Sequence, residues 1–391
     1  YFNKQKDIMK KIRFQGCCKS PEVGIYSNLG IEYFNKQKDI MKKILFLLIA
    51  VLATQTTTAQ NILIVDNTDK NPSGSNYYSD LQEAIDAALS GDIIYVMPSP
   101  NSYGNVDIED KEGLTLIGLG YNTSAINKNF NYGSELGTID VDNSSHLVFK
   151  GLQINQIFLD NANTTDPSST IVVHGSVLGN IVASFVQGLT VSHSYIDKLT
   201  LSNDDNTAVI FRRCIINPAG SSISDYKDIR NGNFHNSIFF DFTVRSISNS
   251  TFKNNIFLKT QRYQYADAQI QEIADNNNTF LNNFFDITLP LNDGSNFGEN
   301  NVVNEALNPT DIFADTAVSN STNVFDMNWD VTPKLSSLLN AGTDGTHIGP
   351  SGGVGTYSNS IFSLPFVYDI IIPTEIKAGE DIEVTIKAKG N

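Results

Sequence analysis

The chain has 391 residues, of which 40% are apolar and only 18% charged, so it can bury a large core and is not a disordered polar tract. Its 27 glycines and 12 prolines exclude a collagen-like or mucin-like composition. The formal net charge of −15 argues against a nucleic-acid partner, because such binding needs Lys and Arg to neutralise phosphate. One large domain or two ordinary ones would fit this length.

Residues 41–60 have the features of a secretory signal peptide. Met41, Lys42 and Lys43 precede an apolar run at 44–53, and small polar residues follow it up to Gln60. The run is shorter than the roughly 20 residues that cross a bilayer, so no membrane span is predicted. We therefore expect an exported protein that is extracellular, held at the cell surface or periplasmic.

Residues 1–40 precede this signal and contain an exact duplication, because the sequence YFNKQKDIMKKI at 1–12 recurs at 33–44. We interpret 1–40 as a doubtful leader duplicated in the DNA, with Met41 as the initiator. A solenoid repeat is disfavoured, since the period occurs only twice and has no apolar pattern. Cleavage near Gln60 would leave 17 basic and 38 acidic residues, a net charge of −21, with Cys214 as the only cysteine and hence no internal disulfide.

The body of the chain begins with one amphipathic helix, predicted over residues 79–91. Its apolar positions follow helical spacing, and Ser79 with Gln82 forms a capping box before Gly91 ends the helix. Strands are predicted at 93–97 and 114–117, and a short second helix at 266–274. The apolar face of the first helix comprises Leu81, Ala84, Ile85, Ala88 and Leu89.

A six-residue pattern recurs four times further along the chain. The copies begin at Phe211, Phe234, Phe252 and Phe280, with spacings of 23, 18 and 28 residues. Irregular spacing near twenty is typical of stacked coils whose loops vary in length. We expect the Phe and the last two apolar residues to frame one core, while Asn residues turn the chain and stack in ladders. The two predicted polar columns are Asn236, Asn254 and Asn282, and beside them Cys214, Ser237, Asn255 and Asn283.

The segment from Tyr78 to Val96, with Tyr103 and residues 114–118, resembles the opening of the right-handed parallel β-helix proteins of the pectin lyase-like superfamily. Residues 340–349 resemble the closing coil of many secreted bacterial members. The resemblance implies an all-β solenoid over residues 61–355, with an N-terminal capping helix and roughly 10 to 12 coils. A β-sandwich is the rival fold. Because the superfamily includes lyases, hydrolases, epimerases and adhesins, the resemblance assigns no activity.

The last part of the chain, residues 356–391, is predicted to be a short C-terminal β extension. Strands at 366–372 and 382–388 flank a polar turn, and about 25 residues are too few for an independent sandwich. We expect a hairpin packed against the last coil, with the start of an Ig-like module as the alternative.

The search for catalytic groups yields only weak candidates. A pectate lyase-like site would need acidic ligands for calcium and an Arg base. The nearest residues are Asp204 and Asp205 with Arg212 and Arg213, although adjacent carboxylates are also ordinary turn residues. Lys259 and Arg262 could supply a basic pair, but no matching motif surrounds them. The oxygen-rich residues 66–76 leave calcium open as a cofactor, although they lack the Gly and terminal Glu of a calcium loop. No metal spacing relates the five histidines, which are His146, His174, His193, His235 and His347.

Aligning the six-residue patterns places basic residues together. Arg212, His235 and Lys253 share one outward column, with Arg213 beside it, and we predict that these four residues bind uronates or sulfates. The alternative is that they only keep a face solvated. The sequence thus favours a β-helix protein that contacts polysaccharide or a cell-surface glycan, with no catalytic residue assigned. The alternatives are a polysaccharide lyase or glycoside hydrolase acting on acidic glycans, and an adhesin or structural rod.

Overall fold

The computed structural model describes residues 60–68, 74–120, 132–161, 170–184, 186, 188–202, 206–216, 229–240, 247–258, 277–285, 295–303, 309–315, 330–353, 366–371 and 385–389. The predicted leader, the signal peptide up to Ala59 and the helix predicted at 266–274 lie outside these residues.

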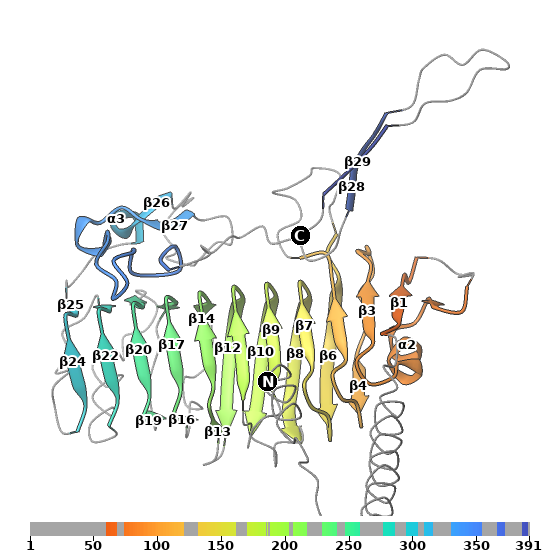
Figure 1. Ribbon diagram of the computed structural model, residues 1–391, viewed down its shortest axis with the longest axis horizontal. Helices are drawn as coiled ribbons and strands as arrows, with labels where there is room; N and C mark the ends of the chain where they lie inside the picture. The colour runs from red at the N-terminus through yellow and green to blue at the C-terminus, as the bar shows by residue number, and fades with distance from the viewer. Residues whose placement is uncertain are drawn as a thin grey trace, which may run out of the picture. The chain divides into compact units, whose positions relative to one another are not determined.

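Two parallel sheets made from successive coils form a β-solenoid (Figure 1). The twelve-stranded sheet runs in the order β2 (Tyr77–Tyr78), β1 (Ile62–Val65), β3 (Ile93–Val96), β5 (Thr115–Ile117), β7 (Val148–Lys150), β9 (Ile171–His174), β11 (Leu189–Ser192), β14 (Ile210–Arg212), β17 (Asn233–His235), β20 (Thr251–Lys253), β22 (Thr279–Leu281) and β24 (Phe297–Glu299). The ten-stranded sheet runs in the order β25 (Val302–Val303), β23 (Phe284–Phe285), β21 (Ile256–Leu258), β18 (Ile238–Phe240), β15 (Ile215–Ile216), β12 (Tyr195–Ser202), β10 (Val177–Ser184), β8 (Gln153–Asn161), β6 (Glu135–Asp142) and β4 (Val106–Glu109).

The predicted parallel solenoid is confirmed, and the rival β-sandwich is wrong, since a sandwich needs antiparallel pairs. Strands of one coil pair in parallel with those of the next, as β17 does with β14 and β20. A third parallel sheet joins β13 (Asn206–Thr207), β16 (Ile229–Arg230) and β19 (Ile247–Ser248). The right-handed winding stays a prediction.

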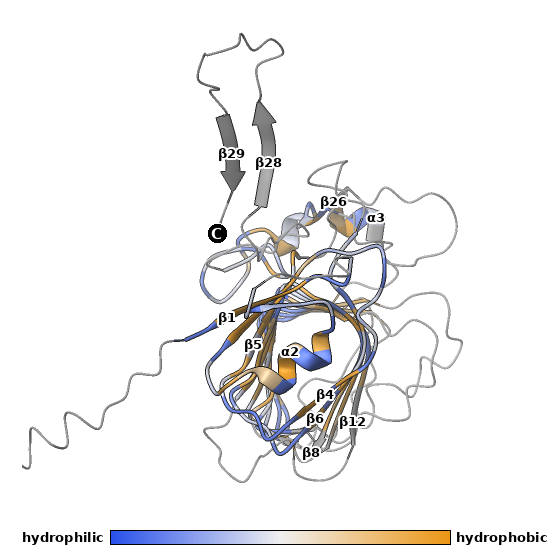
Figure 2. Cartoon of the chain, turned by 90° about the vertical axis from the view of Figure 1, so that its right-hand side faces the viewer, coloured by the Kyte–Doolittle hydropathy of each residue, from blue (hydrophilic) through white to orange (hydrophobic). Residues whose placement is uncertain are grey.

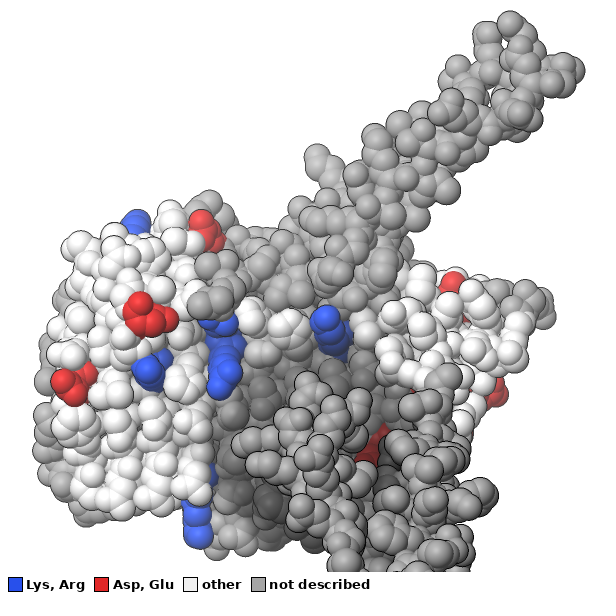
Figure 3. Space-filling view, in the orientation of Figure 1, with Lys and Arg blue, Asp and Glu red and all other residues white. Residues whose placement is uncertain are grey.

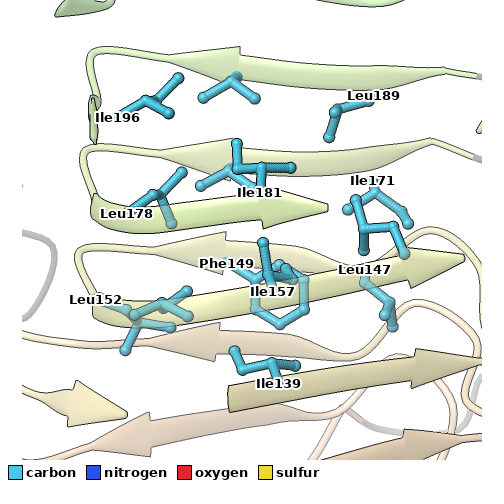
Figure 4. Packing of buried hydrophobic residues seen from close by; sticks show 14 of the residues in the cluster. Ile139, Leu147, Phe149, Leu152, Ile157, Ile171, Leu178, Ile181, Leu189 and Ile196 are labelled. Carbon is cyan, nitrogen blue, oxygen red and sulfur yellow. The ribbon is translucent and has the colours of Figure 1, made fainter. Parts of the chain in front are cut away.

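The main core fills the space between the two large sheets. Alternate residues of each strand point inward, as Leu63 and Val65 do in β1, and are almost completely buried. Figure 4 shows Phe149, Ile157, Leu178 and Ile181 from neighbouring coils meeting in this interior. Burial of apolar side chains coil after coil is the main stabilising force in such a solenoid.

The six-residue pattern stacks Phe on Phe. The rings of Phe211, Phe234, Phe252 and Phe280 form one stack, with centroid distances of 5.5, 4.6 and 4.8 Å between successive rings. A second stack of Phe239, Phe257 and Phe285 has distances of 4.9 and 4.7 Å. These positions are the first and the sixth of the pattern, so the alignment deduced from the sequence is the true register of the coils.

One predicted polar column forms a buried ladder. The backbone N–H of Asn255 donates to Asn283 Oδ1 at 2.9 Å, and that of Asn283 donates to Asn301 Oδ1 at 2.9 Å. Ser237 and Cys214 continue the ladder at earlier coils, where the Cys214 N–H donates to Ser237 Oγ. The Cys214 thiol is fully buried, and this burial raises its pKa to about 12. The ladder satisfies backbone donors that the turn would otherwise leave without partners.

The fifth residues of the pattern point outward, which the sequence analysis did not anticipate. Ile215, Ile238, Ile256 and Phe284 belong to a second core on the outer face of the ten-stranded sheet. A later part of the chain covers them. It contains α3 (Pro309–Ile312), β26 (Phe313–Asp315), β27 (Asp330–Pro333) and the 3-10 helix η4 (Ser336–Leu338), and its residues in this second core are Ile312, Phe313, Val331, Leu338 and Ile348.

Residues 340–353, which we call the strap, follow η4 and differ from the closing coil that the resemblance implied. They add no strand to either large sheet. The extension at the C-terminus is an antiparallel hairpin of β28 (Phe366–Ile371) and β29 (Thr385–Lys389), as predicted. Its packing against the last coil stays a prediction.

The N-terminal helix α2 (Leu81–Ala87) is shorter than predicted. Asp80, not Ser79, is its N-cap, and the Asp80 side chain accepts a hydrogen bond from the Glu83 N–H. The helix ends at Ala87, with Ala88 as its C-cap, so Leu89 is 61% exposed and lies outside the core. Leu81, Ala84 and Ile85 are buried in the main core, and Figure 2 shows α2 lying across the interior of the coils in the end-on view.

That α2 caps the first coil stays a prediction, which implies that loss of this helix exposes the coil. Deleting residues 80–90 should cause aggregation or loss of a cooperative unfolding transition, because apolar side chains of the first coil would face water. Ile85→Asp should lower the free energy of unfolding by several kcal/mol, on the order of the cost of burying a charge. Glu83→Gln, on the exposed side of α2, is the matched control. Urea unfolding measures all three, and an unchanged transition in the deletion variant would mean that α2 is not a cap.

Candidate functional site

The predicted basic residues Arg212, His235 and Lys253 lie side by side on three neighbouring strands. Arg212 of β14 is the register partner of His235 in β17, which is in turn the partner of Lys253 in β20. Residues adjacent to them in sequence, such as Phe211 and Phe252, point into the core, so these three face outward. The predicted column is therefore present in the fold.

The column extends further than the sequence analysis found. Lys150, His174 and Ser192 continue it on β7, β9 and β11, in unbroken register with Arg212. The sequence signal was weak here, because the inward positions of these strands are Phe149, Val173 and Val191 and do not repeat the later pattern. We call the six outward residues the basic column: Lys150, His174, Ser192, Arg212, His235 and Lys253.

Arg213 does not belong to the basic column, although it was predicted to lie beside it as a binding residue. It has a positive φ of 51°, which turns its side chain out of line with Arg212. Its Nε donates a hydrogen bond to the carbonyl oxygen of Gly352 at 3.2 Å. Burial first, and then the neighbouring Arg212, lower the pKa of Arg213, while Asp344 acts in the opposite direction. The Arg213 guanidinium therefore helps to hold the strap.

The predicted column of Asn236, Asn254 and Asn282 also holds the strap. All three residues have a positive φ, which Asn tolerates better than most side chains. Asn282 Nδ2 donates to the Ala341 carbonyl at 2.7 Å, and Asn236 Nδ2 donates to the Gly349 carbonyl at 3.2 Å. Asn254 lies between them and both donates to Thr343 Oγ1 and accepts from the Thr343 N–H. These amides therefore bind a distant segment of the chain.

The histidines of the basic column are poor bases. Burial first, and then the charges of Arg212 and Lys253, lower the pKa of His235 to about 4. Burial, His193 and Lys150 lower the pKa of His174 to about 4 in the same way. Both rings are therefore neutral hydrogen-bonding groups at physiological pH. His174 Nδ1 and Ser192 Oγ share a hydrogen bond of 2.9 Å.

Negative charge borders the basic column at one end. Leu281 and then Glu299 follow Lys253 in the same register. Asp344 of the strap has a lowered pKa, for which the Thr346 hydroxyl that it accepts from is the first cause and Lys253 a smaller one. Figure 3 shows acidic side chains lying among the basic ones on the visible face, where the basic side chains form no unbroken band.

The structure adds little support for the other residues that were predicted as catalytic or metal-binding candidates. Asp204, Asp205, Lys259 and Arg262 lie outside the described residues. Asp66 accepts hydrogen bonds from the Thr68 N–H and hydroxyl, which is an ordinary turn arrangement. Among the residues that the structure describes, no three His, Cys, Asp or Glu side chains gather where they could share a metal ion. His347 Nδ1 accepts from the Asn340 N–H within the strap.

No family model matches the chain, and no curated protein matches it. In the described part of the chain, no helix is both long and apolar enough to cross a membrane.

The strap contacts predict a measurable stability cost at Asn254. Asn254→Gly keeps the positive φ but loses two side-chain hydrogen bonds, so unfolding should cost about 1 to 3 kcal/mol less. Asn254→Leu should be worse, because Leu is strained at a positive φ. Asn231→Gly is the control, since Asn231 is exposed and also has a positive φ. Equal stability of Asn254→Gly and the wild type in urea unfolding would contradict the role of the strap.

The lowered histidine pKa values predict a pH dependence of stability. Unfolded His has a pKa of about 6.5, so between pH 6.5 and 4 the unfolded chain binds protons that folded His174 and His235 do not. The free energy of unfolding should therefore fall as the pH drops through this window. Urea titrations at pH 7 and pH 5 measure this decrease in the free energy of unfolding. It should be smaller in the double variant His174→Gln and His235→Gln than in the wild type. An identical fall in variant and wild type would contradict the prediction.

Proposed function

We propose that the protein is exported and binds an acidic polysaccharide along the basic column, without transforming it. The observation that carries the proposal is the register of six outward side chains on six successive strands, each able to donate a hydrogen bond. A linear polymer is a fitting ligand, because the column presents one such group about every 4.8 Å along a straight line.

The chemistry of the column suits carboxylates and sulfates. Arg212 is exposed and presents a planar guanidinium that can bind either group through two parallel hydrogen bonds. Lys150 and Lys253 are half-buried and add charge at two other points of the column. His174, His235 and Ser192 are neutral, and they can hydrogen-bond to sugar hydroxyls between the charged groups.

The enzymatic alternative has less support from these residues. A lyase or hydrolase needs a base or an acid whose pKa is suited to its reaction, beside the bound sugar. The histidines of the column titrate near pH 4. Arg212 remains the candidate base of a pectate lyase-like site, but the acidic residues that it would need, Asp204 and Asp205, lie outside the described residues. A polysaccharide lyase or glycoside hydrolase is therefore our second choice, and a structural rod would need only the solenoid.

Binding experiments with charge variants test the proposal. Titration calorimetry should detect binding of at least one member of a panel of polygalacturonate, alginate and chondroitin sulfate. The double variant Arg212→Ser and Lys253→Ser should bind it about tenfold or more weakly at low salt, and salt should reduce the difference. The double variant Lys198→Ser and Lys334→Ser, which removes the same charge elsewhere, should bind like the wild type.

Two outcomes would contradict the proposal. Equal binding by the wild type and the Arg212 and Lys253 variant would remove the basic column from consideration. Release of unsaturated sugars, followed by their absorbance during the same incubations, would favour a lyase over a binding protein. Affinity should not rise between pH 7 and pH 5.5, because His235 and His174 remain neutral over that range.

A further inference from the structure

The line of outward residues that forms the basic column continues past Lys150 with a different chemistry. Ile117 of β5 is the register partner of Lys150, and Tyr95 of β3 is the partner of Ile117. Ile64 of β1 and Tyr77 of β2 complete the same line. We call these four residues, Tyr77, Ile64, Tyr95 and Ile117, the apolar column.

The apolar column is accessible to a ligand. Tyr77 is 48% exposed, and Ile64, Tyr95 and Ile117 are half-buried. Their neighbours in sequence, Val65, Ile94, Val96 and Leu116, fill the main core, so the four side chains lie on the outer face of the sheet. Two tyrosines and two isoleucines on one line form an outward apolar strip, which is a common mark of a binding surface.

We infer that the apolar column is a second subsite of the same binding surface, on which sugar rings of the acidic polysaccharide stack. This inference rests on the proposed function. Tyr is suited to the task, because its ring offers a broad apolar face while its hydroxyl stays in contact with water and sugar hydroxyls. The basic column would hold the acidic groups, and the apolar column would hold the C–H faces of sugars beyond them.

The shared register of the two columns and the positive charge of the basic column together identify the ligand of this surface. The two columns share one register over the ten strands from β2 to β20, so a single extended chain can follow both. Nine steps of about 4.8 Å give a length of about 43 Å, of which the basic column takes about 24 Å. The ligand is therefore a long acidic polysaccharide, and only a fragment longer than the basic column reaches the tyrosines.

The test compares long and short fragments of whichever acidic polysaccharide of the panel the wild type binds. The double variant Tyr77→Ala and Tyr95→Ala should bind the long fragment about tenfold more weakly. This loss should be the same at low and high salt, since stacking is not screened. Binding of a fragment no longer than the basic column should not change. Tyr77→Phe with Tyr95→Phe should keep most of the affinity, and Tyr132→Ala, at an exposed tyrosine outside both columns, is the control.

The outcomes separate this inference from the proposed function. If the Arg212 and Lys253 variant loses binding while the Tyr77 and Tyr95 variant binds the long fragment like the Tyr132 control, the apolar subsite is overturned and the basic column stands. If only the tyrosine variant loses binding, the apolar subsite stands and the role of the basic column is overturned. If the wild type binds no acidic polysaccharide, both are overturned.

Discussion

In-register parallel pairing sets each residue beside its counterpart one coil away, and the other features of the solenoid follow from this repeat of about 4.8 Å. Because the repeat places equivalent positions of successive coils side by side, a residue type whose side chains attract one another stabilises the solenoid at every coil. Phe is such a residue, and stacked rings add roughly 0.5 to 1.5 kcal/mol per pair beyond their burial. Asn is another, because its amide oxygen accepts from the backbone of the neighbouring coil, as Asn283 does from Asn255.

The same repeat makes a column of like charges destabilising, because like charges on directly paired residues repel each other. In the basic column, neutral side chains separate the cations. His235 stands between Arg212 and Lys253 and stays neutral, while His174 and Ser192 stand between Lys150 and Arg212. The cations are thus about 10 and 14 Å apart, beyond the distance of about 8 Å at which physiological salt screens them. The neutral side chains thus keep repulsion between the cations of the column small.

Sequence reasoning recovered the solenoid and the register of its C-terminal half, because the Phe pattern repeats there with fixed internal spacing. It missed Lys150, His174 and Ser192, since Val173 and Val191 stand where the later pattern has Phe, and Phe149 is followed by Gly151, Leu152 and Gln153, which do not match that pattern. It misjudged Arg213 and the fifth residues of the pattern for a different reason. Gly352 lies 139 positions from Arg213, and the fifth residues are covered by a later segment that includes Ile312, Phe313 and Ile348, so nothing local in the sequence indicates these contacts.

The strap changes how the solenoid should come apart. A stack of coils held only by nearest-neighbour contacts frays from its ends, one coil at a time. The strap is hydrogen-bonded to Arg213, Asn236, Asn254 and Asn282, which belong to four successive coils. Opening any one of these coils strains the contacts that the strap makes with the others. The coils from β14 to β22 therefore form one cooperative unit, whose amide hydrogens should exchange with solvent together.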